Sequence, residues 1–284
     1  MSHKWISIII STVVCAPLFY LMMTRFDSFR LEESLPKVAV TFIYIGISIV
    51  VSFVIALLIS IFSKSVKNQN EMEDELKNNG LSDRFVEVAQ QELNRYPTAN
   101  SLKTYHFKYL LLLTVAYCRR NRIQDALNTI NRIDPQLILK RLGASSMAEI
   151  YSLQYYDAQV CICETMDDIG RLDNVMNAGK RWFDETAGKS VNHKLLLDEI
   201  YSVYYAMHGE YAQAMKFADH SIGIGGRLPS LCGHLFKAKI YARMGDAENA
   251  NAMVSKAFEY VKNQVDMQEV EDVKKFISKY TQIL

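Results

Sequence analysis

The chain has 284 residues, and its 32 basic and 31 acidic side chains give a formal net charge of +1. This balance excludes the strongly basic proteins that bind nucleic acid through the bulk charge of their surface, so we expect no nucleic-acid partner. Five cysteines without regular spacing favour reduced thiols and argue against a small disulfide-stabilised secreted domain.

The first 63 residues contain two long uncharged stretches. Residues 5–24 carry no Asp, Glu, Lys or Arg, and neither does the second stretch, residues 38–63. Helices over these stretches would measure roughly 30 and 39 Å, against a hydrocarbon core of about 30 Å. We therefore expect residues 1–63 to form a membrane anchor with two transmembrane helices.

A cleaved signal peptide is the alternative for residues 5–24. No A-x-A-like site follows that stretch, and its apolar core is longer than that of a signal sequence. The second stretch has small residues at every fourth position, which on a helix form one face where two helices can pack closely. The residues that we expect to make this transmembrane packing are Ser48, Ser52, Ala56 and Ser60. Chance enrichment of serine explains the same pattern equally well.

Basic residues near the two stretches predict the orientation of the chain. The loop 25–37 contains three of them, whereas Lys4, Lys64, Lys67 and Lys77 flank the other ends. The positive-inside rule slightly favours cytoplasmic termini, as do the reduced thiols. The sequence therefore predicts a multi-pass membrane protein with two spans and both termini in the cytoplasm.

The rest of the chain is predicted to be all helical. A linker at 64–81 ends in the turn Asn78-Asn79-Gly80, and residues 82–284 show helical periodicity without strand signals. The expected helices are 82–95, 101–120, 123–133, 145–167, 171–186, 192–208, 211–223, 229–244, 247–263 and 267–281. Paired helices with short turns are typical of a stacked helix-hairpin repeat.

Three stretches of this domain, 117–126, 205–214 and 241–250, align with one another. Each has a tyrosine nine positions before an alanine, with a Gly or Asn turn between them, and a weaker copy runs through 170–175. The repeat-packing positions are Tyr117, Asn121, Ala126, Tyr205, Gly209, Ala214, Tyr241, Gly245, Ala250 and, later in the last repeat, Ala257. Taking Val175 as the fourth anchor beside the three alanines gives spacings of 49, 39 and 36 residues.

This pattern resembles the tetratricopeptide repeat (TPR). In that family an aromatic residue lies near the end of helix A, a small residue makes the turn, and an alanine near the start of helix B lets the two helices cross closely. The resemblance implies a helical solenoid over 82–284 whose inner groove is lined by helix A. Matching the family's ligand-facing positions gives a candidate protein-binding groove of Lys108, Arg119, Glu199, Val203, Met207, Lys239 and Arg243. Its four basic residues could meet a carboxylate-bearing peptide, and solvated surface charge is the alternative for each.

No catalytic, cofactor or metal site is predicted. Cys161 and Cys163 are two apart on a predicted helix and point in different directions, and so do the consecutive residues Asp219-His220-Ser221. The glycines of 223–226 follow a helix and have no Lys-Ser/Thr after them, which favours a helix cap over a phosphate loop. Two tyrosine-rich stretches, 151–156 and 201–205, fit either core packing or a recognition surface.

These observations predict a non-enzymatic adaptor, anchored in a membrane, whose TPR-like groove binds a protein partner at the cytoplasmic membrane face. The expected partners are an unidentified protein and the lipid bilayer, and self-association of the chain is left open. The alternative is an accessory subunit of a larger membrane complex that assembles through its transmembrane helices.

Overall fold

The computed structural model describes residues 50–51, 53–56, 66–98, 101–143 and 145–281, in two compact units, residues 1–70 and 71–284. Every regular element among the described residues is a helix. After helical backbone over 66–79, the second unit contains α3 (Asp83–Leu93), α4 (Thr104–Arg119), α5 (Ile123–Ile130), α6 (Pro135–Leu142), α7 (Ser146–Met166), α8 (Ile169–Thr186), α9 (Val191–Met207), α10 (Tyr211–Ile224), α11 (Arg227–Arg243), α12 (Ala247–Phe258) and α13 (Gln264–Thr281).

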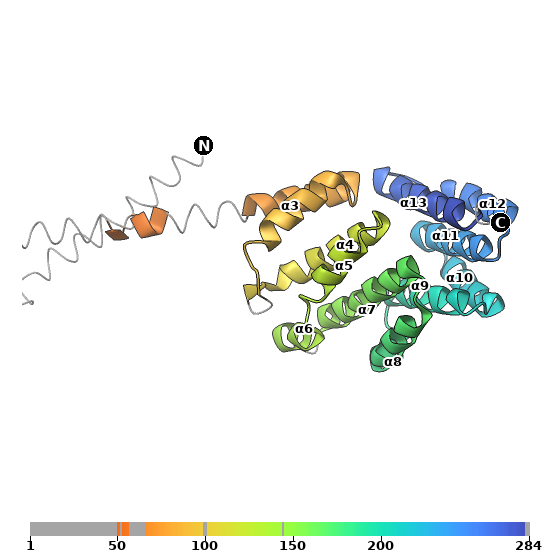
Figure 1. Ribbon diagram of the computed structural model, residues 1–284, viewed down its shortest axis with the longest axis horizontal. Helices are drawn as coiled ribbons and strands as arrows, with labels where there is room; N and C mark the ends of the chain where they lie inside the picture. Colours follow the sequence, from red (N-terminus) through yellow and green to blue (C-terminus); the bar gives the residue numbers. More distant parts are fainter. Residues whose placement is uncertain (1–49, 52, 57–65, 99–100, 144, 282–284) are drawn as a thin grey trace, which may run out of the picture. The chain divides into compact units, whose positions relative to one another are not determined.

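The helices of this second unit pack as four consecutive hairpins. The pairs are α4 with α5, α7 with α8, α9 with α10, and α11 with α12. The first helices of the hairpins also contact one another in order, from α4 through α7 and α9 to α11 and then α13. Figure 1 shows the resulting solenoid-like array, which agrees with the coarser prediction of a helical repeat.

The four hairpin turns share one backbone geometry. Asn121, Asp167, Gly209 and Gly245 all have a positive φ, between 54° and 76°. In each turn the next residue donates its N–H to the carbonyl oxygen five residues earlier, at 2.9 or 3.0 Å. These bonds satisfy carbonyl groups that the end of the first helix leaves without partners. Three turns lie where the aligned stretches predicted them.

The fourth turn corrects the register of the weaker copy. Because Asp167 occupies the turn, the position five residues later, equivalent to the three alanines, is Leu172 and not Val175. Leu172 is fully buried, as are the alanines of the other hairpins and Ala257. A small side chain at this crossing brings two helix backbones close together, and leucine there is compatible with a wider crossing.

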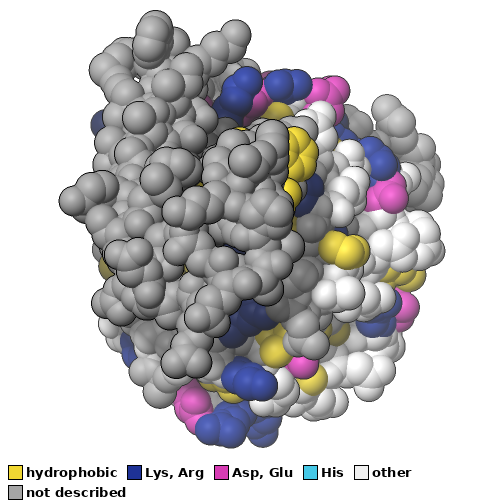
Figure 2. Space-filling model, turned by 90° about the vertical axis from the view of Figure 1, so that its left-hand side faces the viewer, with side chains coloured by type: hydrophobic (Ala, Val, Ile, Leu, Met, Phe, Trp, Pro, Cys, Tyr) yellow, Lys and Arg dark blue, Asp and Glu magenta, His cyan; other side chains and the backbone are white. Residues whose placement is uncertain are grey.

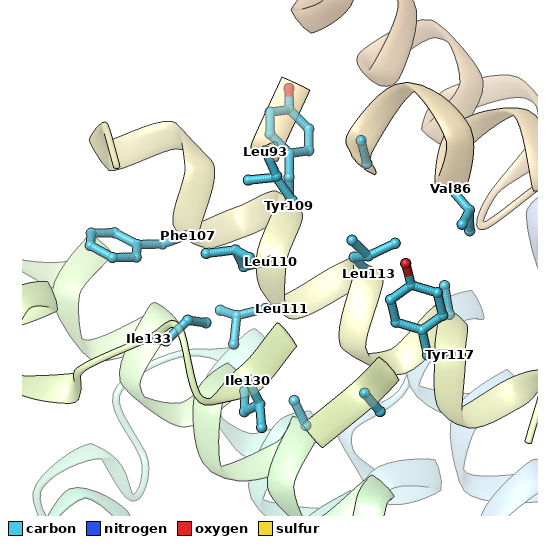
Figure 3. Packing of buried hydrophobic residues seen from close by; sticks show 14 of the residues in the cluster. Val86, Leu93, Phe107, Tyr109, Leu110, Leu111, Leu113, Tyr117, Ile130 and Ile133 are labelled. Atoms are coloured by element: carbon cyan, nitrogen blue, oxygen red, sulfur yellow. The ribbon is translucent and has the colours of Figure 1, made fainter. Parts of the chain in front are cut away.

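The core of the first hairpin extends to α3 and α6. Ten of the 16 residues of α4 are buried, so this helix has neighbours on most sides. Figure 3 shows Leu111 pointing toward Ile130 and Ile133, and Tyr117 lying near Val86. The helix α6, which the sequence analysis did not predict, is inserted after α5 and packs on α7 and α4.

The last helix brings the end of the array back to its beginning. One face of α13 packs on α11 and α12 through Val270, Val273 and Ile277. From the same helix, Gln268 accepts a hydrogen bond from the backbone N–H of Leu81 at 3.0 Å. Glu269 pairs with α4, 150 residues earlier in the chain. Figure 1 shows α13 facing α3 with the end that lies away from the C-terminus.

The prediction of a two-span membrane protein is contradicted. Within the part of the chain that the structure describes, no helix is both long enough and apolar enough to cross a bilayer. The longest of the helices α3 to α13 is α7, with 21 residues. Its three acidic residues, Glu149, Asp157 and Glu164, make it too polar to cross a bilayer. This finding corrects the transmembrane part of the expected fold class and the membrane localisation with cytoplasmic termini.

The predicted spans themselves fall largely outside the described residues. This holds for all of 5–24 and for all of 38–63 except 50, 51 and 53–56, which are helical. Of the residues expected to make the transmembrane packing, Ala56 is described and exposed, whereas Ser48, Ser52 and Ser60 lie outside the described residues.

Candidate functional site: the inner face of the repeat array

The structure brings four of the seven predicted groove residues together. We use "inner cluster" for these four and the acidic residues around them. The inner cluster consists of Arg119 on α4, Asp157 and Glu164 on α7, Glu199 on α9, Lys239 and Arg243 on α11, and Glu269 and Asp272 on α13. The surface that these residues form is called the inner face below.

Arg119 joins the first and last helices of the array. Its Nη2 donates to both carboxylate oxygens of Glu269, at 2.6 and 2.7 Å, and its Nη1 lies 3.2 Å from Oδ2 of Asp272. Burial opposes the charge of the guanidinium, but the two carboxylates raise the pKa of Arg119 above its ordinary value. The guanidinium therefore stays charged, with Nη2 hydrogen-bonded to Glu269 and Nη1 in an ion pair with Asp272.

Lys239 makes a second bridge, from α11 to α7. Its Nζ donates to Oε2 of Glu164 at 2.7 Å. Because α9 packs against both helices, this ion pair passes across α9. Burial disfavours the ammonium charge, whereas Glu164 and Glu199 favour it and together raise the pKa of Lys239 above its ordinary value.

Arg243 lies one turn further along α11. Its side chain is 6% exposed, and its Nη1 donates to Oδ1 of Asp167 at 3.1 Å. Its guanidinium carbon lies 5.4 Å from the ring centre of Phe276 and 4.7 Å from that of Tyr280, both on α13. The distances place it for cation–π interaction with both rings.

Two carboxylates of the inner cluster are left without such partners. Among the described residues, neither Asp157 nor Glu199 has a hydrogen bond or an ion pair within 4.0 Å. Burial raises the pKa of Asp157 well above its ordinary range, and the charge of Glu199 adds to this. Burial also raises the pKa of Glu199, an effect that Lys239 partly opposes. Both residues are half-buried, so their side chains still reach solvent.

The other three predicted groove residues lie elsewhere. Lys108 is near the start of α4, where its Nζ binds Glu73 at 2.8 and 2.9 Å. Val203 and Met207 are 5% and 7% exposed and belong to the core between α7, α8 and α9. The sequence offsets assigned the correct helices but did not separate the inner face from the adjoining core.

The acidic members of the inner cluster other than Glu199 were missed by the sequence analysis. Asp157 and Glu164 follow the periodicity of the inner face of α7. A repeat alignment that takes Asp167 as the turn residue would have assigned them to that face. Glu269 and Asp272 belong to α13, which lies beyond the aligned repeats. Their spacing of three residues, on one face of a predicted helix, was the available signal.

Other residues singled out in the sequence have structural partners. Ser221 donates its hydroxyl to Asp198 at 2.8 Å, and the His220 Nδ1 lies 2.9 Å from both oxygens of the same carboxylate. Cys163 is buried in the core. Cys161 packs against the core cluster that contains Cys118 of α4, and the proximity of that thiol, together with burial, raises the pKa of Cys161. No group of three metal-ligating side chains occurs among the residues described.

The tyrosine-rich stretches contribute to packing within the hairpins, between α7 and α8 and between α9 and α10. Tyr156 donates its hydroxyl to the carbonyl oxygen of Ala178 at 3.1 Å. The ring of Tyr201 stacks on Phe217 of α10, with centres 5.0 Å apart. Gly225 and Gly226, with φ of 78° and 90°, form the turn between α10 and α11, as the helix-cap interpretation predicted.

The face of the molecule shown in Figure 2 has a mixed charge. Where described residues are visible, basic side chains are interspersed with acidic and apolar ones. No protein-family model matches the chain, and neither the curated proteins nor the solved structures give a significant match.

Proposed function

We propose that this chain is a non-enzymatic, TPR-like scaffold that binds a segment of a protein partner on the inner face of its helical array. The observation that carries the proposal is the gathering of Arg119, Glu199, Lys239 and Arg243 on one surface, built from α4, α7, α9, α11 and α13. Charged side chains held in place on adjacent helices are suited to recognising an extended or helical segment.

The TPR-like assignment is supported by the backbone of the hairpins. The positive φ at four equivalent turns, the shared hydrogen bond across each turn, and the fully buried Ala126, Ala214 and Ala250 reproduce the features on which the resemblance was based. Repeat arrays of this kind present a continuous inner surface because each hairpin adds one helix to it.

The non-enzymatic assignment is supported by how the reactive residue types are used. Ser221 is fully buried and donates to Asp198, which His220 also contacts. A serine nucleophile would instead donate to the histidine that removes its proton. The same carboxylate therefore stabilises the α9–α10 hairpin at both contacts.

Site-specific photocrosslinking of the full-length chain in its native cells tests this function without assuming the charge of the ligand. A compact diazirine amino acid would replace Glu199 on the inner face and, as a matched control, the exposed Gln213 on α10. The proposal predicts a discrete crosslinked protein from position 199 that is absent from position 213. Crosslinks from position 213 alone, or none from position 199 in a chain whose helical circular dichroism is intact, would refute it.

A further inference from the structure

The charges of the inner cluster do not balance. It contains five acidic residues, Asp157, Glu164, Glu199, Glu269 and Asp272, and three basic ones, Arg119, Lys239 and Arg243. The sequence had suggested that basic side chains would meet a carboxylate on the ligand. The structure instead occupies each of these cations from within the chain.

Each pairing is a direct contact. Arg119 holds Glu269 and Asp272, and Lys239 holds Glu164. The third cation, Arg243, contacts Asp167 at 3.1 Å, with Glu164 at 3.9 Å. A ligand carboxylate would have to displace one of these acids. Among the described residues of the inner face, the groups that remain without a paired charge in direct contact are carboxylates.

The two carboxylates of the inner cluster that have no counter-ion in direct contact among the described residues are Asp157 and Glu199. They lie on adjacent helices, α7 and α9. Asp157 interacts electrostatically with Glu199, and both carboxylates interact with Lys239 and Glu164. Both side chains therefore lie in the neighbourhood of the Lys239–Glu164 bridge, on two helices that pack together. Burial without a counter-ion is unfavourable for a carboxylate, and a cation bound between the two would relieve it.

Arg243 gives an independent indication that the inner face takes a ligand. Its side chain is 6% exposed, yet its Nε and Nη2 have no hydrogen-bond acceptor among the described residues. Buried donors without acceptors are uncommon in folded proteins. The carbonyl oxygens of a peptide backbone are acceptors of the kind that these donors lack.

We propose that the inner face recognises a basic segment of a partner protein, with an Arg or Lys side chain of that segment bound between Asp157 and Glu199. This inference rests on the proposed function and specifies the chemistry of the partner. A guanidinium fits the position well, since its five donors can serve both carboxylates at once.

Fluorescence anisotropy with the full-length chain tests the inference. The probes are three labelled nine-residue peptides of the same length, in which Arg, Gln or Glu alternates with Gly. The test variant is Asp157→Asn with Glu199→Gln, which keeps the side-chain shape and removes both charges. The control variant is Glu248→Gln with Glu259→Gln, which removes two exposed acidic charges of α12 and its C-terminal cap.

The inference predicts that the Arg peptide binds the wild-type chain at least tenfold more tightly than the Gln or Glu peptides. It also predicts about a tenfold loss of this affinity for each inner carboxylate removed, with less than a twofold change in the control variant. No binding of the Arg peptide, preference for the Glu peptide, or equal losses in the two variants would overturn it. If the crosslinks from position 199 persist in that event, the scaffold function stands and the basic specificity alone is refuted.

Discussion

The Lys239–Glu164 bridge offers a quantitative test of the inner face. We consider Lys239→Met, which keeps most of the length of the side chain and removes its charge. In the wild-type chain Nζ lies 2.7 Å from Glu164, with side-chain exposures of 24% for Lys239 and 10% for Glu164. The variant leaves Glu164 near Asp157 and Glu199, with Arg243 as the remaining cation.

The expected loss of stability follows from the burial of the pair. Exposed ion pairs contribute about 0–1 kcal/mol. Removing one partner of a fully buried pair costs about 3–5 kcal/mol, because a charge is left without compensation. At the exposures of Lys239 and Glu164 we expect an intermediate loss of about 2 kcal/mol. For a domain of this size each kcal/mol shifts the melting temperature by about 2–4 °C, which gives about 4–8 °C.

The matched control is Lys237→Met, two residues away on the same helix. Lys237 pairs with Asp219, whose side chain is 62% exposed, so its loss should cost less than about 1 kcal/mol. Both variants would be measured by urea unfolding of the full-length chain, followed by circular dichroism. Equal destabilisation by the two substitutions, or a loss below about 0.5 kcal/mol for Lys239→Met, would refute the account of a buried bridge between α7 and α11.

Three further predictions concern the array itself. Ala250→Leu should overpack the crossing of α11 and α12 and cost about 1–3 kcal/mol in urea unfolding, whereas the exposed Ala252→Leu on the same helix should be nearly neutral. Gly209→Ala should cost about 1 kcal/mol, because φ is 76° there. Gly223→Ala, inside α10 with open space around the added methyl, should be neutral or slightly stabilising; a reversed order of the two glycine variants would contradict the turn geometry. Burial lowers the pKa of His106 from 6.5 to about 4, so the unfolded chain gains a proton first and stability should fall as pH drops from 6.5 toward 4. His106→Gln, which keeps an acceptor for the helix cap, should show a shallower fall in urea midpoint over that range, and an unchanged slope would contradict the assignment.

Much of the helical architecture could be read from local signals. Periodicity, turn residues and prolines predicted ten helices, each within a few residues of the observed elements, because amphipathic faces and caps are encoded by neighbouring residues. The short helix α6 was missed although Asp134 and Pro135 mark its start. There Asp134 accepts a hydrogen bond from the N–H of Gln136 at 2.9 Å.

Contacts between distant parts of the chain could not be predicted in this way. The approach of α13 to α4 depends on the accumulated rotation of four hairpins, which no local pattern specifies. For that reason the sequence identified Arg119 as a groove residue without indicating that Glu269 would neutralise it. The prediction of a two-span membrane protein rested only on the length and hydropathy of the uncharged stretches, and it is contradicted.

The most direct test of the account is a charge swap between α4 and α13. It compares the full-length wild type with Arg119→Glu, with Glu269→Arg and with the chain that carries both substitutions. If the array closes as described, each single variant should speed amide hydrogen exchange in α13, and the double variant should restore protection to most of its wild-type level. Additive losses in the double variant, or wild-type exchange in both single variants, would show that α13 does not close the inner face against α4.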